Sequence, residues 1–342
     1  MMKPLYLVMA IALGAAPAVA GAPASSAVIG DLLRAADPLA LDGEALDGPR
    51  LRALYDGRAQ QPLWIVGGDG ARVDPVFATL ADVAAQGLEA AHYHPVQIAA
   101  RRAALDERAA SELEVLLSDA LLRYASDARV GRRQPQVTTG EVDIAPRSFD
   151  AVAAVRDLAS APDVRLALEQ LPNHNPEYQR LRDLLARFRQ VAAAGGWGTV
   201  AADSPVPGAS GPAVEALRRR LQAGGELAPN ALGDTFDPEV QEALRRFQKG
   251  AGLAVDGVVN KATRDALNVP IATHIDQVRA NMERWRWFPE DLGDRHVLVN
   301  IADFRLQLVD RGTVVSEMPV IVGKNDWRTP IIISQIQQLV FN

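Results

Sequence analysis

Two short helices can be recognised in residues 237–267, which read DPEVQEALRRFQKGAGLAVDGVVNKATRDAL. Asp237 has a side chain suited to an N-cap, and Pro238 after it suits the first position of a helix. Asn260 caps residues 261–267 in the same way. The stretch therefore predicts one helix that begins at Pro238 and a second that begins after Asn260.

The residues between these two helices have the composition of a tight connection. Gly250 and Gly252 are placed to end the first helix, and Asp256-Gly257 is a turn sequence. We predict a three-helix bundle over residues 213–268, with Phe247 in its core because aromatic residues at helical spacing are usually buried. A further helix near residue 214 repeats the apolar pattern of the helix that begins at Pro238, at an offset of 240 − 214 = 26 positions. Its Val214, Leu217, Leu221 and Gln222 match Val240, Ala243, Leu244, Phe247 and Gln248.

Helical patterns also dominate the chain on both sides of this bundle. Residues 26–193 contain two apolar stripes at helix spacing, and several prolines divide this all-α region into short helices. Residues 194–212 are rich in Gly, Pro, Ser and Ala, so we expect a linker there. Residues 271–292 begin with a helical pattern, which predicts a connector helix. The second upstream stripe comprises Tyr178, Leu181, Leu184, Leu185, Phe188 and Val191.

The pattern changes to β in residues 295–342. Alternating or continuous apolar runs predict four strands, and Asp310-Arg311-Gly312 has the composition of a hairpin turn. Such strands must bury an apolar face, and the sequence provides no further element to cover it. We therefore expect an incomplete β-rich domain here and a multidomain α+β fold overall. The predicted strands are residues 296–301, 304–309, 313–322 and 331–341.

The composition of the chain excludes several kinds of chemistry. Its 342 residues include no cysteine, which rules out a disulfide framework, a thiolate zinc site, an iron–sulfur cluster and a cysteine nucleophile. The formal net charge of −6 gives no basic footprint, so we expect no nucleic acid as a partner. The five histidines are scattered, and although His92 and His94 are close together they lack further ligands nearby. We expect a structural role for them, no metal and no other cofactor.

The first residues have the three parts of a secretory signal peptide. A short start with one positive charge, MMK, is followed by an apolar run over residues 5–16 and by the small-x-small site AVA at residues 18–20. The apolar run is too short to span a bilayer. We expect a signal peptide over residues 1–20, cleavage after Ala20, and export to the periplasm.

The three-helix unit resembles the small peptidoglycan-binding domain found in many cell-wall enzymes. Its caps, its turn and its apolar stripe all fall in the order of that domain, which implies peptidoglycan as the partner. The residues that carry this resemblance are Phe247, Gln248, Gly252, Leu253, Asp256, Gly257, Thr263, Ala266 and Leu267. The candidate contact residues that follow from it are Arg245, Arg246, Phe247, Gln248, Asp256 and Gly257.

Two arginine groups in this unit admit two interpretations. Arg218-Arg219-Arg220 and Arg245-Arg246 could bind the carboxylates of stem peptides through charge-assisted hydrogen bonds. The alternative is that both groups form the exposed faces of amphipathic helices. The sequence leaves the two interpretations open.

Residues on both sides of the bundle resemble the other domains of the YcbB-like murein L,D-transpeptidases. The segment NMERWRWFP at 281–289 resembles the connector of that family, and VIVGK at 320–324 followed by Thr329-Pro330 resembles the opening strands of its YkuD-type catalytic domain. The resemblance thus covers nearly the whole chain after the signal peptide. The residues that resemble the scaffold domain of the family are Tyr55, Arg58, Pro62, Leu63, Trp64, Gly87, Leu88, Tyr93, His94, Leu121, Leu122, Arg123, Tyr124, Pro172, Asn175, Pro176 and Tyr178.

The chemistry implied by this resemblance is acyl transfer through a cysteine. In the family, the thiolate attacks a stem peptide from a Ser-x-Gly-Cys-x-Arg segment, with a His-Gly upstream, and both follow the Thr-Pro motif. No residue of this chain matches those positions, so no catalytic residue can be named and we predict no transpeptidase activity for the chain.

Two interpretations of the missing catalytic residues remain open. The first is a truncated copy of an enzyme whose intact form crosslinks peptidoglycan. The second is a non-catalytic protein that binds peptidoglycan or regulates its synthesis. A wall hydrolase is a weaker alternative, because no metal or acid–base set is visible. The resemblance also admits cell-wall synthesis proteins as partners.

Overall fold

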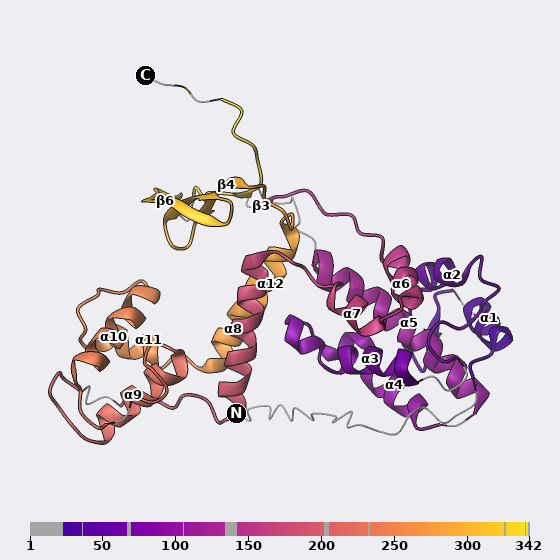
Figure 1. Cartoon of the computed structure of the whole chain (residues 1–342), viewed down its shortest axis with the longest axis horizontal. Helices are drawn as coiled ribbons and strands as arrows, with labels where there is room; N and C mark the ends of the chain where they lie inside the picture. Colours follow the sequence, from indigo (N-terminus) through magenta and orange to yellow (C-terminus); the bar gives the residue numbers. More distant parts are fainter. Residues whose placement is uncertain are drawn as a thin grey trace.

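The protein has a helical N-terminal body, a pair of long helices, a three-helix unit and a small sheet (Figure 1). The computed structural model describes residues 23–340, apart from 36, 67–69, 105, 134–141, 202–204, 232, 325 and 339. The predicted signal peptide and its cleavage site lie outside these residues. The arrangement confirms the multidomain α+β class.

The N-terminal body is built around α5, Glu107–Val130, which is buried along most of its length because other helices surround it. The Asp106 side chain caps α5 by accepting a hydrogen bond from the Ala109 N–H at 2.8 Å. Two short strands, Ala40–Leu41 (β1) and Glu44–Ala45 (β2), pair at one side of the body. The other elements of the body are α1 (Ser26–Arg34), α2 (Gly48–Tyr55), α3 (Gly70–Ala81), η1 (Val83–Gln86), η2 (Ala90–Tyr93), α4 (Pro95–Arg102), α6 (Ala151–Ser160) and α7 (Val164–Glu169).

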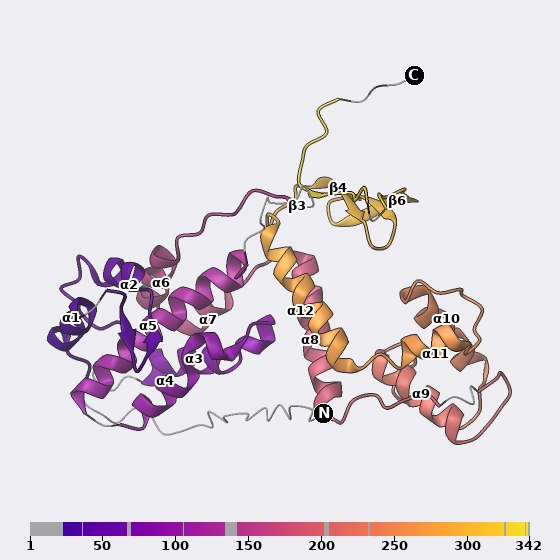
Figure 2. The same ribbon diagram turned by 180° about the vertical axis from the view of Figure 1, so that it is seen from behind.

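The long helix α8, Pro176–Ala193, leaves this body and lies along α12, Ile271–Trp287, as both views of the molecule show (Figures 1 and 2). The apolar stripe predicted on residues 178–191 therefore packs against the connector helix. The buried core of the pair consists of Tyr178, Leu185, Val278 and Met282.

The three-helix unit lies at the end of this pair where α8 ends and α12 begins (Figure 2). It contains α9 (Pro212–Gly224), α10 (Pro238–Gly250) and α11 (Lys261–Leu267) around one apolar core. Trp197 and Val200, which belong to the predicted linker, are buried here. The segment is therefore attached to folded structure at these two residues, whereas most of its other described residues are exposed.

The β-rich region forms the antiparallel order β4-β5-β6, with strands Arg295–Asn300, Arg305–Asp310 and Thr313–Pro319. Arg311 and Gly312 both have positive φ, as the predicted hairpin turn requires. The fourth predicted strand is much shorter than expected. Within the described part of residues 331–341, only Ile331–Ile332 (β7) forms a strand, and it pairs in parallel with Val142–Asp143 (β3).

No helix in the described ranges combines the length and the hydropathy that a membrane span requires.

Candidate functional site

The helix starts predicted in the three-helix unit are present. The Asp237 carboxylate accepts a hydrogen bond from the Val240 N–H at 2.9 Å, and the Asn260 side chain accepts one from the Thr263 N–H at 2.9 Å. These bonds satisfy backbone donors that a helix leaves unpaired at its N-terminus. The caps fix where α10 and α11 begin, and thereby fix the loop between them.

Gln248 organises that loop from a fully buried position on α10. Its amide nitrogen donates to Asp256 Oδ1 at 2.7 Å, and it lies within hydrogen-bonding distance of Val258 O and Thr263 Oγ1. Its side-chain oxygen accepts a hydrogen bond from the Gly257 N–H at 2.8 Å. The structure thus brings together three of the residues singled out by the sequence: Gln248, Asp256 and Gly257.

Asp256 is exposed and forms one corner of the loop. Its Oδ1 accepts hydrogen bonds from the Val258 N–H at 2.9 Å and from the Gln248 amide. These bonds favour the ionised form, so they hold the pKa of Asp256 below its ordinary value. The loop therefore presents a carboxylate that stays charged in mildly acidic solution.

Gly257 lets the loop approach α10 closely. Its φ is +71°, in the left-handed region that favours glycine. A Cβ on this residue would lie 2.8 Å from Gln241 Cγ and 3.1 Å from Arg245 Nε. The Asp256-Gly257 turn and Arg245 are consequently neighbours on one surface.

The remaining predicted site residues divide between core and surface. Phe247 is buried in the core of the unit, as expected from its spacing. Arg246 is exposed and donates from Nε and Nη2 to the carbonyl oxygen of Glu226, at 3.1 and 2.7 Å. Arg245 is partly exposed and pairs with Glu242 at 3.3 Å. Of the two, Arg245 borders the loop that Gln248 organises, whereas the Arg246 guanidinium lies at Glu226, just after α9.

The first arginine group is different, because Arg218 and Arg220 are both buried. Arg218 Nη1 donates to Asp237 Oδ2 at 2.8 Å, and Arg220 Nε donates to the carbonyl oxygen of Leu267 at 2.8 Å. The interpretation of this group as an exposed helix face is therefore wrong for these two residues and holds only for Arg219. Arg218 and Arg220 join elements of the unit to one another.

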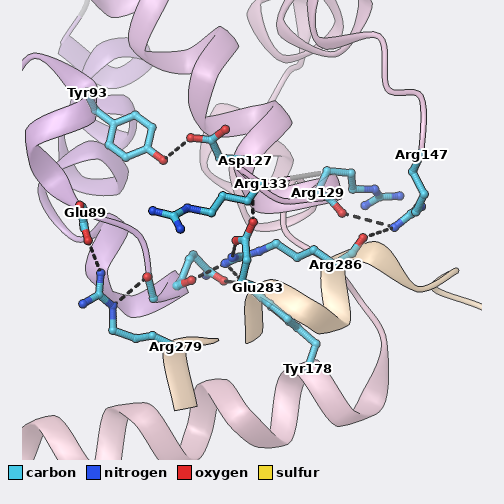
Figure 3. A network of polar contacts seen from close by, with 12 residues as sticks. Glu89, Tyr93, Asp127, Arg129, Arg133, Arg147, Tyr178, Arg279, Glu283 and Arg286 are labelled. Atoms are coloured by element: carbon cyan, nitrogen blue, oxygen red, sulfur yellow. Dashed lines mark hydrogen bonds and ion pairs between the residues drawn. The ribbon is translucent and has the colours of Figure 1, made fainter. Parts of the chain in front are cut away.

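A second polar assembly joins α12 to the N-terminal body (Figure 3). The buried Arg286 guanidinium donates to Tyr178 Oη at 2.9 Å and to Glu283 Oε2 at 2.8 Å, and it also bonds the carbonyl oxygen of Gln86. Glu283 Oε1 in turn accepts a hydrogen bond from the Arg133 N–H at 2.7 Å. The connector helix is thus held to the body by bonds to three separate segments.

The same interface continues on both sides of Arg286 (Figure 3). Arg279 Nε donates to the carbonyl oxygen of Gly87 at 3.0 Å, and its Nη2 donates to Glu89 at 3.1 Å. Nearby, Tyr93 donates to the Asp127 carboxylate at 2.8 Å, and burial raises the pKa of Asp127. Arg286 and Glu283 lie in the connector segment 281–289 quoted above, but Arg279, Glu89 and Asp127 did not stand out in the sequence.

Two further buried carboxylates in the N-terminal body were also missed from the sequence. Glu114 accepts hydrogen bonds from Tyr55 Oη and from the backbone N–H groups of residues 63–65, at distances of 2.6 to 3.0 Å. Asp119 accepts one from His94 Nε2 at 2.7 Å. His94 is buried, and among the described residues no group of three potential ligands could hold a metal ion. The structural role expected for His94 agrees with this geometry.

Comparisons with known proteins agree with this architecture. The model of a scaffold domain matches residues 49–185, that of a peptidoglycan binding domain matches residues 210–267, and that of an L,D-transpeptidase catalytic domain matches residues 294–342. A stretch of 61 residues is 44% identical to the N-acetylmuramoyl-L-alanine amidase CwlL of Bacillus licheniformis. That stretch is 18% of this chain, which spans about a sixth (17%) of the length of the amidase.

The helical body, the connector, the three-helix unit and the sheet thus define a peptidoglycan-binding protein of the L,D-transpeptidase type. These three domains, in this order, are consistent with a YcbB-like L,D-transpeptidase.

Proposed function

We propose that this protein is exported by its predicted signal peptide, binds peptidoglycan through the surface formed by Arg245, Arg246 and the Asp256-Gly257 turn, and serves the crosslinking reaction of its family. The observation that carries the binding surface is the loop held by Gln248, which places the exposed Asp256 and the adjoining Gly257 beside Arg245, while Arg246 is the next, exposed residue of α10. Stem peptides carry carboxylates, and guanidinium groups bind carboxylates through paired, charge-assisted hydrogen bonds.

Co-sedimentation of the full-length chain with purified sacculi tests this proposal. The unmodified chain is expected to sediment with sacculi, and the double variant Arg245→Ala/Arg246→Ala is expected to remain largely in the supernatant. Arg219→Ala is the matched control, because Arg219 is an exposed arginine on another helix of the same unit. Failure of the unmodified chain to sediment would refute peptidoglycan binding. Equal sedimentation of the double variant would refute this surface and leave binding itself intact.

The catalytic part of the proposal is limited by the composition of the chain. Crosslinking in this family requires a thiolate, and the 342 residues contain no cysteine. We infer that these residues alone bind the wall and do not carry out acyl transfer. The 61-residue similarity to an amidase is too local to transfer hydrolytic activity.

Sequencing the encoding DNA beyond codon 342 distinguishes a truncated enzyme from a non-catalytic protein. A His-Gly and a Ser-x-Gly-Cys-x-Arg segment encoded downstream of codon 342, in any frame, would identify an interrupted or partial enzyme. Their absence would favour a non-catalytic protein that binds or regulates.

A further inference from the structure

Residues 142–147 connect three parts of the protein that belong to different domains. Val142 and Asp143 form strand β3, which pairs in parallel with Ile331 and Ile332 of β7. β7 directly follows the Thr329-Pro330 motif in the catalytic-domain match. A segment that leads into helix α6 of the scaffold region thus adds a strand to the C-terminal region.

Arg147, at the other end of this segment, lies where two helices end. Its Nη1 is 3.0 Å from the carbonyl oxygen of Phe288, 3.1 Å from that of Arg286 and 3.4 Å from that of Arg129. Arg286 and Phe288 are at the C-terminus of α12, and Arg129 is at the C-terminus of α5. The last carbonyl groups of a helix lack intrahelical partners and carry partial negative charge. The Arg147 guanidinium therefore interacts favourably with the C-terminal carbonyl groups of both helices.

Glu290 completes this cluster on the C-terminal side of α12. Its Oε1 lies 2.8 Å from Arg129 Nε and 3.8 Å from Arg147 Nη2. Ile144, between the strand and Arg147, is buried. The segment is therefore anchored at both ends, by backbone pairing with β7 at one end and by the hydrogen bonds of Arg147 at the other. Figure 3 shows the Arg147 end.

We infer that residues 142–147 form a strap by which the scaffold domain holds two points of the C-terminal region in place, the end of α12 and strand β7, with Arg147 as the positioning residue. Domains joined by small, polar contacts move relative to one another by default. The strap opposes that motion at the place where the chain passes from α12 into β4. Such a strap determines how the domains are placed, a role separate from the binding of peptidoglycan.

A distance measurement between the two domains tests the strap. The chain has no natural cysteine, so the double variant Asp157→Cys/Ser334→Cys can carry two nitroxide labels, one at an exposed position of α6 and one at an exposed position two residues after β7. Pulsed electron paramagnetic resonance on this full-length chain is expected to give one narrow distance distribution. In the same background, Arg147→Ala is expected to broaden the distribution by about twofold, because the default interdomain motion returns.

Three further variants separate positioning from simple loss of structure. Arg147→Lys keeps a cation with three N–H donors beside the carbonyl oxygens, so it is expected to keep the narrow distribution. Arg165→Ala, which removes an exposed scaffold arginine paired with Glu169, is the matched control and is expected to leave it unchanged. Ile332→Pro removes a backbone donor from β7, far from the scaffold core, and is expected to broaden the distribution as Arg147→Ala does.

A broad distance distribution in the labelled parent chain would contradict the proposed strap. So would a narrow distribution in Arg147→Ala with native helical content. If Arg147→Ala does not fold, Ile332→Pro decides the question, and a narrow distribution there overturns the inference.

Discussion

The guanidinium of Arg220 lies over the indole ring of Trp197, with Cζ 3.9 Å from the ring centroid. Trp197 follows α8, and Arg220 is on α9 of the peptidoglycan-binding unit, so this stacked pair joins the unit to the α8–α12 pair. The Trp197 indole N–H also donates to the carbonyl oxygen of Val269, just before α12, at 3.1 Å. The wall-binding unit is therefore docked on the helix pair through one aromatic residue with partners on two sides.

Trp197→Ala is expected to destabilise this junction. The substitution removes a buried aromatic side chain and its cation–π contact, which together correspond to about 3 kcal/mol of unfolding free energy. Denaturant unfolding followed by far-UV circular dichroism measures the loss. Trp327→Ala is the matched control, because Trp327 is 78% exposed and its removal is expected to leave the midpoint unchanged. Equal midpoints for both variants would contradict the role assigned to Trp197.

Two glycines of the wall-binding unit give a matched test of the loop. Gly252 and Gly257 both have positive φ, +66° and +71°, but only Gly257 has other atoms within 4 Å of the position of a Cβ. Alanine at either position is expected to cost about 1 kcal/mol for the strained backbone. Gly257→Ala is expected to cost more and to weaken sedimentation with sacculi, because Gln241 and Arg245 must move. If the two variants have the same stability and the same sacculus binding, the close approach of the loop to α10 has no consequence.

The same unit is expected to lose stability in acid. The Val240 N–H, followed by the Arg218 hydrogen bond, holds the pKa of Asp237 below its ordinary value, and the Val258 N–H does the same for Asp256. A carboxylate with a lowered folded-state pKa contributes stability that is present above its unfolded pKa of about 3.9 and is lost as the pH falls through the folded value. Unfolding free energy measured from pH 6 down to pH 2 should therefore fall most steeply below about pH 4.

Asp256→Asn tests the origin of this dependence. It is expected to make the acid-side slope shallower, since one of the carboxylates with a lowered pKa is gone. Asp276→Asn, at an exposed aspartate of α12 that pairs with Arg279 at 3.5 Å, serves as the control and should keep the original slope. An unchanged slope in Asp256→Asn would mean that other groups cause the acid transition.

The sequence was most informative where local signals agree with tertiary packing. Caps at Asp237 and Asn260, a turn at Asp256-Gly257 and the spacing of Phe247 all depend on neighbouring residues, so α10, α11 and their loop could be predicted closely. The arginine triplet at 218–220 could not, because charged residues are rarely buried and their partners, Asp237 and Leu267, are distant in sequence.

Contacts between segments far apart in the chain could not be predicted from the sequence either. Strand β3 has two residues, too few for an alternating pattern, and it pairs with β7 across most of the chain. The apolar stripe of α8 was visible, but periodicity does not identify the partner of a helix face, which is α12. Glu114 and Asp119 interrupt an apolar helix pattern as ordinary polar residues do. Only the structure reveals the backbone and side-chain donors that surround them.

The 342-residue chain is expected to release no D-alanine from tetrapeptide stems. In the reaction of its family, a thiolate attacks the stem-peptide carbonyl, forms a thioester and expels D-alanine, and an amine then takes the acyl group. Without a thiol, neither the thioester nor the leaving group can form by that route. The measurement is free D-alanine after incubation with purified stems, using protein that has first been shown to sediment with sacculi. Binding without release is the expected combination. Release above the protein-free background would show that this chain carries another nucleophile.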